Sequence, residues 1–343
     1  MTPVTLSICI ATLNRATFLR QALESIIAQA TEEVEVVIVD GASTDDTEQV
    51  VRQYQLRYPR LTYLRLAAKG GVDQDYSRTI ELAQGKYCWF MSDDDILKPG
   101  AIRTLLAATQ QDYSLIIVNS EMRTFDMREV MDLRRLPISA DRIYQPAEYR
   151  QLFVDTGFYL SFIGAVVIQR ELWNARDKQR YFGTEFVHVG VIFQSPLPGA
   201  ALVLAEPLLA LRYGNAQWSP RYFEIWMMKW PRLVWSFPNF SEAEKQQVYP
   251  REPWRNLKTL LIFRAQGVFS WTEYSLWIRP QREAGVVRLT AGAIACVPGR
   301  LASLLMLAYF SIARPSDAMR LAELRDSRFY YKRCLRCMWP GRR

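Results

Sequence analysis

Three adjacent carboxylates stand at the end of one apolar segment of the sequence. Tyr87–Met91 carries no charge and is followed by Ser92 and then by Asp93–Asp95. Carboxylates this close repel one another, and burial would raise their pKa values, so a bound cation best explains the cluster. Oxygen ligands, completed by a substrate diphosphate, are what Mg²⁺ or Mn²⁺ uses. The alternative is the acidic first turn of a helix, which the helix dipole also favours.

A further carboxylate, Asp40, ends the β-branched run Val34–Val39 and precedes a tight turn of small residues at 41–44. Such an aspartate can accept hydrogen bonds from a nucleobase edge or a ribose. The same turn could instead cap the next helix, and both interpretations stay open at this point.

Composition narrows the chemistry further. The chain has 343 residues, half of them apolar and 23% charged, which is typical of a globular protein of about two domains. Its one histidine, His188, excludes a multi-histidine zinc site. Five scattered cysteines make no disulfide framework and favour a reducing compartment. No G-x-G-x-x-G or G-x-x-x-x-G-K-[ST] motif occurs. Carboxylates are therefore the expected chemical groups.

The elements that must position these carboxylates alternate between strands and helices. Short apolar runs predict strands at 4–11, 34–39, 61–66, 87–91 and 115–118, and helical spacing predicts helices at 18–27, after 44, near 74–84 and near 99–109. This alternation predicts an α/β fold with a doubly wound, mostly parallel sheet covered on both faces. Ligands are then expected at the carboxyl ends of its strands.

Several segments carry a family resemblance. LSICIATLNRATFLRQALESI at 6–26, EVVIVDGASTDDT at 35–47 and ELAQGKYCWFMSDDDILKPGAI at 81–102 resemble family 2 glycosyltransferases of the GT-A fold. GGVDQDYSRTIELAQGKYCWFMSDDD at 70–95, FIGAVVIQRELW at 162–173 and RYGNAQW at 212–218 are similar to the abequosyltransferase-like subgroup, which acts on bacterial surface polysaccharides. The resemblance implies a nucleotide-diphosphate-sugar donor, a divalent metal (Mn²⁺ or Mg²⁺) and transfer of the sugar to a hydroxyl.

The resemblance also implies roles for single residues near the donor nucleotide. It places Thr12, Asn14 and Arg15 beside the nucleotide, Asp40 on its base or ribose, and Asp93 on the ribose.

The metal motif departs from the family pattern. The usual D-x-D-D begins here with Ser92 in place of its first aspartate. We expect Asp94 and Asp95 to hold the metal, with Asp93 as the next candidate.

A second departure lies upstream of that motif. Many relatives have A-R-N where this chain has Asp75, Tyr76 and Ser77, with an arginine only at Arg78. Asp73 and Asp75 could accept a hydrogen bond from an exocyclic amine. We therefore hypothesise that the donor carries cytosine rather than uracil, with Arg78 as another donor-binding candidate.

Sugar transfer with inversion needs a general base for the acceptor hydroxyl. The family places an acidic residue roughly ninety positions beyond the metal motif, and Glu185 lies 91 positions after Asp94. His188 is three residues further on, so a helix there would put both side chains on one face. Either one could be the base, and a satisfied core histidine is the alternative for His188. Retention of configuration is not excluded by spacing.

Arg212, Asn215 and Trp218 follow the apolar run Leu202–Leu211. Arg212 could bind the diphosphate and Trp218 could stack on the sugar or base. Surface ion pairing and core packing are the alternatives.

The excess positive charge is confined to the last third of the chain. Residues 1–239 carry 25 Lys/Arg against 27 Asp/Glu, whereas residues 240–343 carry 18 against 8. This basic, aromatic and helical tail favours peripheral contact with an anionic membrane over nucleic acid, with a homodimer or packing domain as the alternative. The N-terminus lacks signal-peptide features, so we expect a cytoplasmic protein on the inner face of the cytoplasmic membrane.

Together these observations predict a metal-dependent glycosyltransferase that uses a lipid-linked or polysaccharide acceptor. Residues 1–218 would form the GT-A domain, with a donor half at 1–110 and an acceptor half at 111–218, and residues 219–343 a helical domain. A nucleotidyltransferase also uses paired aspartates and metal, but its first turn normally carries a basic phosphate-binding loop. A non-catalytic nucleotide-binding membrane scaffold is the other alternative.

Overall fold

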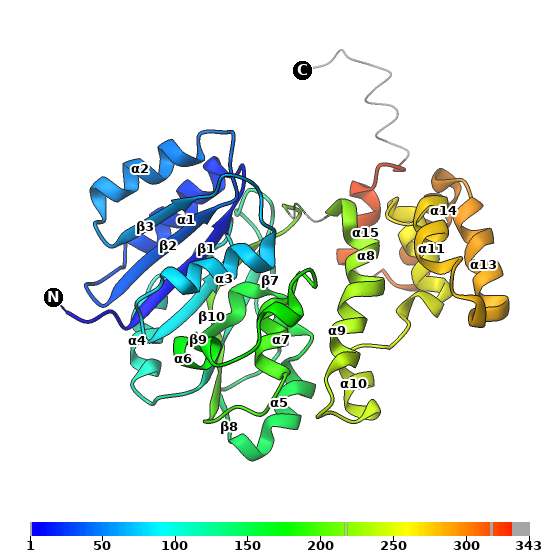
Figure 1. Ribbon diagram of the computed structural model, residues 1–343. Coiled ribbons are helices and arrows are strands. Elements are labelled where there is room, and N and C mark those ends of the chain that lie inside the picture. Colours follow the sequence, from blue (N-terminus) through cyan, green and yellow to red (C-terminus); the bar gives the residue numbers. More distant parts are fainter. Residues whose placement is uncertain (1, 216, 218, 316–317, 331–343) are drawn as a thin grey trace, which may run out of the picture. The chain divides into compact units, whose positions relative to one another are not determined.

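The computed structural model describes residues 2–215, 217, 219–315 and 318–330 (Figure 1). The chain divides into two compact units, and each is described by itself. Unit 1 comprises Met1–Ala216 and Ser236–Val248, and unit 2 comprises Gln217–Trp235 and Tyr249–Arg343.

Unit 1 is built on one large mixed sheet. Its strands are β1 (Leu6–Thr12), β2 (Val34–Asp40), β3 (Leu61–Arg65), β4 (Tyr87–Met91), β5 (Ile96–Leu97), β6 (Leu115–Arg123), β7 (Val130–Asp132), β8 (Arg142–Tyr144), β9 (Val166–Gln169) and β10 (Ala201–Arg212). The strand order is β3-β2-β1-β4-β9-β6-β10-β5, while β7 pairs with β6 and β8 with β10.

The first part of the sheet is parallel. Strand β1 pairs in parallel with both β2 and β4, and β2 pairs in parallel with β3. Strand β9 then runs antiparallel between β4 and β6, and β10 is again parallel to β6. Strands β1, β2 and β4 are almost wholly buried because helices cover both faces. The predicted α/β fold with a mostly parallel sheet is confirmed.

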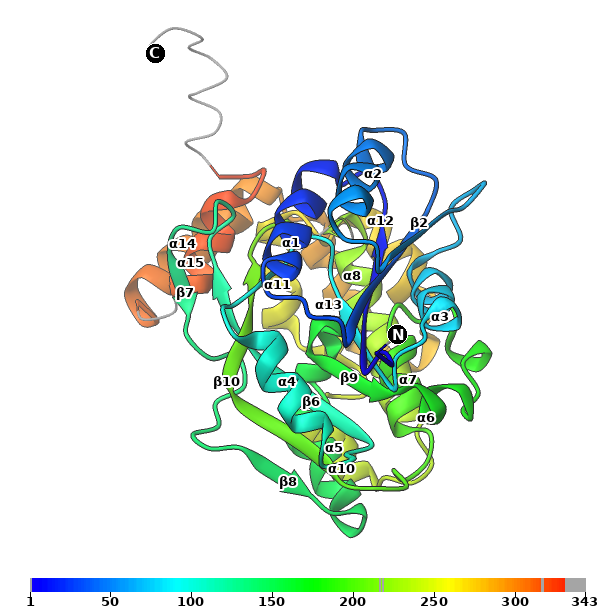
Figure 2. The same ribbon diagram turned by 90° about the vertical axis from the view of Figure 1, so that its left-hand side faces the viewer.

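Helices lie on both faces of this sheet (Figure 2). Those of unit 1 are α1 (Ala16–Ile27), α2 (Thr47–Arg57), α3 (Val72–Leu82), α4 (Ala101–Thr109), α5 (Tyr149–Thr156), α6 (Arg170–Asn174), α7 (Val187–Phe193) and α10 (Glu242–Val248), with 3₁₀ turns at Pro146–Glu148, Tyr159–Ser161, Ile163–Ala165 and Gln179–Tyr181.

Alternation along the strands sorts these helices between two apolar layers. In β4, Trp89 belongs to the core cluster that also holds the buried residues of α1, α2 and α4. Its neighbour Phe90 points the other way and contacts Tyr76 of α3, Trp173 of α6 and His188 of α7. Each fully buried Leu, Ile or Phe side chain contributes about 1.5–3 kcal/mol to the free energy of folding. Packing in these two layers therefore helps to hold the strands in position.

Unit 2 is helical, as predicted for the C-terminal part of the fold. It contains α8 (Tyr222–Glu224), α9 (Trp230–Ser236), α11 (Leu257–Gln266), α12 (Trp271–Glu273), α13 (Gly285–Cys296), α14 (Gly299–Ala313) and α15 (Ala318–Asp326), with π-helical turns at Ile225–Lys229 and Tyr274–Ile278 and 3₁₀ turns at Ser219–Arg221, Pro253–Arg255 and Arg282–Ala284. Aromatic pairs fill its core, such as Phe223 stacked on Phe269 at 5.1 Å between ring centroids.

Among the described residues, no single helix is both long and apolar enough to cross a membrane. One pair, α13 with α14, meets that criterion only when taken together, and the two helices are bent by 103° at the break between them.

Candidate active site

The carboxyl ends of three neighbouring strands converge on the acidic loop. Because β1 lies between β2 and β4 and is parallel to both, the residues that follow these strands share one edge of the sheet. Thr12, the last residue of β1, is buried and donates a 2.7 Å hydrogen bond from Oγ1 to Asp93 Oδ2. The acidic loop after β4 is thereby fixed to the loop after β1.

Arg15 and Asn215 complete the partners of this loop. The Arg15 guanidinium contacts Asp94 Oδ2 at 2.8 Å and Asp93 Oδ1 at 3.4 Å. Asn215 donates from Nδ2 to the same Asp94 oxygen at 2.8 Å and accepts from Arg15 Nη1 at 2.9 Å. Residues far apart in the sequence thus surround Asp94 with positive charge and N–H donors.

Arg212 is hydrogen-bonded to Asp95 and to the backbone of the acidic loop. The Arg212 backbone N–H donates to Asp95 Oδ1 at 3.4 Å, and its guanidinium donates to the Asp94 carbonyl at 3.3 Å. The other Arg212 nitrogens donate to the Phe125 carbonyl and to Gln21. Asp95 is 2% exposed, and its buried Oδ2 has no hydrogen-bond partner among the described residues.

All three carboxyl groups resist ionisation in this environment. Burial and the neighbouring Asp94 raise the pKa of Asp93 to about 6. Burial also raises the pKa of Asp94, and burial together with Asp94 raises the pKa of Asp95 well above its usual range. A cation placed among them would favour the ionised forms and relieve this cost.

These residues fit a divalent cation of the Mg²⁺ or Mn²⁺ type. They offer only oxygen ligands, and the unpartnered Asp95 Oδ2 is buried in the loop. Within the described residues, no three His, Cys, Asp or Glu side chains are already arranged around a metal position. Mg²⁺ is usually bound by one or two carboxylates, with water and substrate phosphates completing its shell.

Asp40 is held rigidly at the end of β2. Its Oδ1 accepts from the Ser43 backbone N–H at 2.7 Å, and its Oδ2 accepts from the Tyr63 hydroxyl at 2.7 Å. Asn14 lies across the same loop, with a positive φ of 55°, and its Oδ1 accepts from the Thr44 backbone N–H at 2.7 Å. Asp40 therefore anchors the turn after β2, but it does not cap α2, whose N-cap is Asp46.

Asp75 faces the same turn from the first turns of α3. It is 7% exposed, its Oδ1 has no hydrogen-bond partner among the described residues, and burial raises its pKa. A Cβ added at Gly70 would lie 2.7 Å from that oxygen, and one at Gly41 would lie 3.3 Å from Oδ2. Two glycines thus approach the Asp75 carboxylate closely, and Asp40 is near enough to raise its pKa further.

Asp73 does a different job from the one predicted. Its carboxylate accepts three backbone N–H groups, from Gly183 and Glu185 to Oδ2 at 2.8 and 2.9 Å and from Val187 to Oδ1 at 3.0 Å. Burial, with the Glu185 carboxylate nearby, raises its pKa to about 6 although the N–H donors favour the ionised form. Asp73 is therefore an anchor for the loop that carries Glu185.

Glu185 sits in a strained position on this loop. Its φ is +73°, which a residue with a side chain rarely adopts, and it is partly exposed just before α7 begins at Val187. Because Asp73 and Asp75 share the first turn of α3, the Glu185 loop is tied to the same element that faces Asp40.

Comparison with known proteins relates part of this chain to a known family. Residues 7–167 match the sequence model described as glycosyl transferase family 2. The chain is a glycosyltransferase whose residues 7–167, just under half of its length, match family 2.

The sequence of this glycosyltransferase is similar to those of bacterial relatives. It is 26% identical over 223 residues to the abequosyltransferase of Salmonella typhimurium, covering 61% of this chain and 67% of that protein. It is 32% identical over 115 residues to the GalNAc(5)-diNAcBac-PP-undecaprenol beta-1,3-glucosyltransferase of Campylobacter jejuni, covering 33% of this chain and 37% of that protein. The alignment with the second relative thus spans well under half of its length.

Solved structures share the fold. The S. aureus TarS 1–349 structure in complex with UDP superposes with a TM-score of 0.58 at 17% identity, covering 98% of this chain and 92% of that chain. The mannosyltransferase of Pyrobaculum calidifontis in complex with GDP-Man and Mn²⁺ gives a TM-score of 0.53 at 13% identity, covering 100% and 90%. This likeness supports the GT-A-type fold of the glycosyltransferase.

His188 is not placed as a base in the structure. We predicted that Glu185 and His188 would share a helix face. They do not, because α7 begins at Val187 and Glu185 precedes it. His188 is 1% exposed, packs against Phe90, and has its Nε2 2.8 Å from the Leu160 carbonyl. Burial lowers its pKa to about 4. The core-histidine alternative describes this residue, because a neutral ring fits the apolar layer behind the sheet.

We expect His188 to make the glycosyltransferase less stable in mild acid. Its pKa is about 4 when folded and 6.5 when unfolded, so between these values the unfolded chain binds more protons and stability falls as pH falls. The loss should reach about 2 kcal/mol between pH 7 and pH 5. Urea unfolding at both pH values should show a smaller difference for His188→Gln than for the wild type, and equal differences would contradict the assignment.

Of the predicted donor-binding residues, Arg78 lies outside this cluster. Arg78 pairs with Glu81 on α3 at 2.6 Å, and its side chain is 49% exposed. This ion pair is the surface contact that a helix residue at i,i+3 makes. Trp218 lies outside the described residues.

Sequence reasoning missed four residues that support the site. Tyr63 donates to Asp40, and Tyr76 donates from its hydroxyl to the Met91 carbonyl at the end of β4 at 3.0 Å. Gln21 accepts from Arg212, and the ring of Phe18 lies 4.7 Å from the Arg15 guanidinium and 5.2 Å from that of Arg212. In the sequence, Phe18 was visible only as part of the helical spacing at 18–27.

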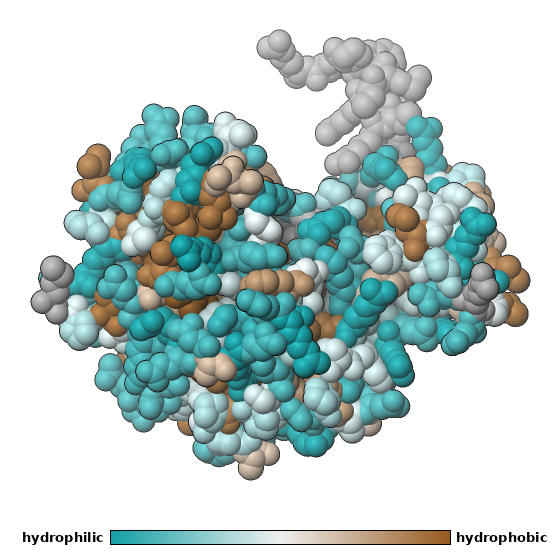
Figure 3. Space-filling model, viewed as in Figure 1, coloured by the Kyte–Doolittle hydropathy of each residue, from teal (hydrophilic) through white to brown (hydrophobic). Residues whose placement is uncertain are grey.

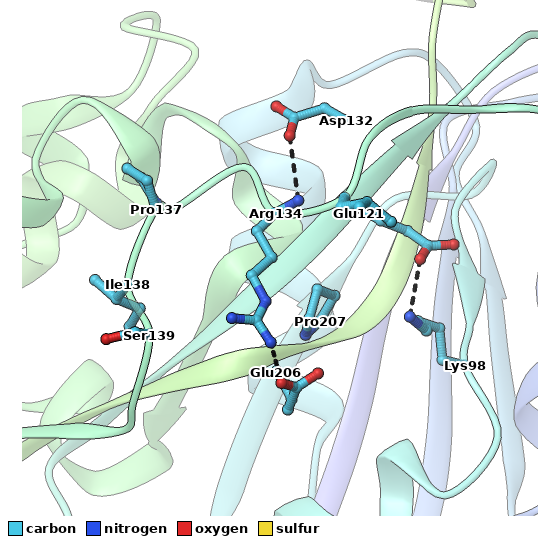
Figure 4. Close-up of a pocket in the computed structure, with 10 residues that line it drawn as sticks. Lys98, Glu121, Asp132, Arg134, Pro137, Ile138, Ser139, Glu206 and Pro207 are labelled. Atoms are coloured by element: carbon cyan, nitrogen blue, oxygen red, sulfur yellow. Dashed lines mark hydrogen bonds and ion pairs between the residues drawn. The ribbon is translucent and has the colours of Figure 1, made fainter.

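A separate open cavity of about 660 Å³ lies along β6 and β10 (Figure 4). Its charged side chains are paired with one another: Lys98 with Glu121 at 2.8 Å, and Arg134 with Glu206. The charged side chains of this cavity therefore neutralise one another.

Proposed function

We propose that this glycosyltransferase binds a nucleotide-diphosphate-sugar together with Mn²⁺ or Mg²⁺ at the acidic loop and transfers the sugar to a hydroxyl of a lipid-linked or polysaccharide acceptor. The observation that carries the proposal is the buried cluster of Asp93, Asp94 and Asp95, with raised pKa values and the unpartnered Asp95 Oδ2. The family membership supports it, as does the Mn²⁺ in the Pyrobaculum structure of the same fold.

The residues around the loop suit a diphosphate donor. Asp94 and Asp95 would hold the cation, which would neutralise charge on the leaving diphosphate. Arg15 and Arg212 are placed beside Asp94 and can stabilise phosphate oxygens, since a guanidinium forms paired hydrogen bonds with them. Thr12 and Asp93 would orient the ribose, and Asn215 would hold Arg15 and Asp94 together.

Glu185 is our candidate for the general base. A base in its ionised form would accept the proton of the acceptor hydroxyl as oxygen attacks the anomeric carbon and the nucleoside diphosphate leaves. Attack from the face opposite the leaving group gives inversion of configuration. The strained backbone at Glu185 and its anchoring by Asp73 support the assignment, because such strain persists where the surroundings hold a functional residue in place.

We propose that Asp75, and not Asp73, contacts the nucleobase of the donor. Its unpartnered Oδ1 beside Gly70 could accept a hydrogen bond from the exocyclic amine of cytosine, whereas the carbonyl oxygen of uracil at that position would repel it. We expect Asp75→Ala to lower the preference for CDP over UDP by about tenfold or more, measured as competing dissociation constants. Glu81→Ala, exposed on the same helix, is the control, and an unchanged preference in Asp75→Ala would exclude the assignment.

A donor screen tests the function as a whole. Release of nucleoside diphosphate is measured with UDP-, GDP-, CDP- and dTDP-sugars, with Mn²⁺, Mg²⁺ or EDTA, and with and without a lipid-linked acceptor. We expect metal-dependent release with one nucleotide class and stimulation by the acceptor. Failure of every donor to respond to metal would count against the proposal. If the acceptor is lipid-linked, we expect the protein to act on the inner face of the cytoplasmic membrane.

A further inference from the structure

The outer face of α14 is apolar although it is exposed. Leu301, Leu304, Leu305 and Ile312 are 48–83% exposed, and Ala308 between them is also exposed. Their spacing of three, four, seven and eleven residues puts them on one side of the helix. The opposite side packs into the core of unit 2 through small and apolar residues, including Ala302, Ser303, Met306 and Phe310. A helix with apolar residues on both sides is typical of one that meets a second apolar phase.

Helix α13 repeats this pattern. Val286 and Leu289 are 76% and 65% exposed, and Ala293 and Cys296 continue the same side of the helix. Its inner side is made of Ala291, Gly292 and Ala295, and a Cβ added at Gly292 would lie 2.9 Å from the Tyr274 ring. Both helices pack on α11, so their apolar outer sides are presented away from it. Apolar surface over α13 is visible at the right of the view in Figure 3.

Charge along this segment has one sign. Between Glu283 and Asp317 the sequence contains no acidic residue, while Arg288, Arg300 and Arg314 are all basic. Arg300 and Arg314 stand near the two ends of α14, and no charge lies on the helix between them. Arginine can keep its guanidinium at the level of lipid phosphates while neighbouring leucines enter the acyl region.

We propose that the apolar sides of α13 and α14, hereafter the α13–α14 face, bind the surface of an anionic lipid bilayer, with both helices lying in its plane. A bend of 103° and the arginines at the ends of α14 suit two interfacial helices better than one continuous span. The uniform positive charge favours lipid over a second copy of the chain, because pairing two copies of this face would bring like charges together. The inference adds a defined contact surface to the proposed function, but it does not depend on the donor chemistry.

Vesicle binding by the full-length protein tests the α13–α14 face directly. The wild type should sediment with phosphatidylglycerol-containing vesicles and bind phosphatidylcholine vesicles much less. Leu304→Glu/Leu305→Glu should lower the partition coefficient by about a hundredfold, because two leucines no longer enter the bilayer. Leu56→Glu on α2, a residue 88% exposed in unit 1, is the matched control and should bind as the wild type does.

The electrostatic part has its own readout. Arg300→Gln and Arg314→Gln should each lower binding to anionic vesicles roughly fivefold and weaken its dependence on salt. Light scattering without vesicles identifies the competing occupant: a wild-type dimer that Leu304→Glu/Leu305→Glu converts to monomer would overturn the proposal in favour of a second copy. Equal vesicle binding by all variants would also overturn it. Nucleotide release with a water-soluble acceptor should be unchanged in every variant, because the substituted residues lie outside the acidic loop.

Discussion

Asp95→Asn is expected to reduce sugar transfer on the order of a thousandfold, the size of effect seen when a group that stabilises charge in the transition state is removed. Asparagine keeps the shape of the side chain and can still accept from the Arg212 backbone N–H at Oδ1. It cannot supply the negative oxygen that a divalent cation requires. The loss should appear mainly in kcat, because the cation acts on the charge that develops as the diphosphate leaves.

The stability of this variant should separate catalysis from folding. Asp95 is a buried carboxyl group whose pKa is raised well above its usual range by burial and by Asp94. A neutral amide removes that cost, so without metal Asp95→Asn should melt at the wild-type temperature or above it. Mn²⁺ with a nucleoside diphosphate should raise the melting temperature of the wild type by a few degrees and leave the variant unchanged. The control is Asp112→Asn, whose side chain is 68% exposed. Near-wild-type transfer by Asp95→Asn would exclude Asp95 as a metal ligand.

Glu185→Gln is expected to lower kcat by about 10²–10⁴-fold, the usual contribution of a general base. The amide cannot take a proton, but it leaves the backbone N–H bond to Asp73 in place. Donor affinity, measured by calorimetry with the nucleoside diphosphate and Mn²⁺, should therefore stay close to that of the wild type.

Two control variants sharpen this test. Glu171→Gln, an exposed glutamate on α6, should leave transfer unchanged. His188→Gln should affect stability far more than kcat, since its ring is buried behind the sheet. If His188→Gln lost activity while Glu185→Gln kept it, the base would have to be reassigned.

Local sequence pattern located the elements of the donor half well. The strands predicted at 34–39 and 87–91 correspond to β2 and β4, and the helices expected near 74–84 and 99–109 correspond to α3 and α4 within two residues at each end. The period and the length of an apolar run indicate how a short segment is buried. The residues within that segment largely decide this pattern. Such patterns do not settle every segment: in the apolar stretch 160–168 only the last residues belong to a strand, Val166–Gln169, and two 3₁₀ turns precede it.

Roles that depend on partners far along the chain were less predictable. Asp73 and Asp75 are equivalent in the sequence, each an aspartate in an acidic first turn. One accepts three N–H groups from residues more than a hundred positions away, and the other keeps an oxygen unpartnered. Arg78 and Arg212 differ in the same way. Arg212 ends β10 and donates to the acidic loop, whereas Arg78 pairs with Glu81 on the surface of α3.

The sequence by itself determined which side chains stand at the carboxyl ends of the strands, because strand period and the turns that follow are encoded locally. It therefore supplied the carboxylates at 40 and 93–95 and the positive charge of the tail. Only the tertiary structure decided that His188 is a neutral core residue, that Asp73 anchors the Glu185 loop, and that Asn215 meets Asp94. Those outcomes depend on which faces pack together across more than a hundred residues, and burial then sets the charge that each group can carry.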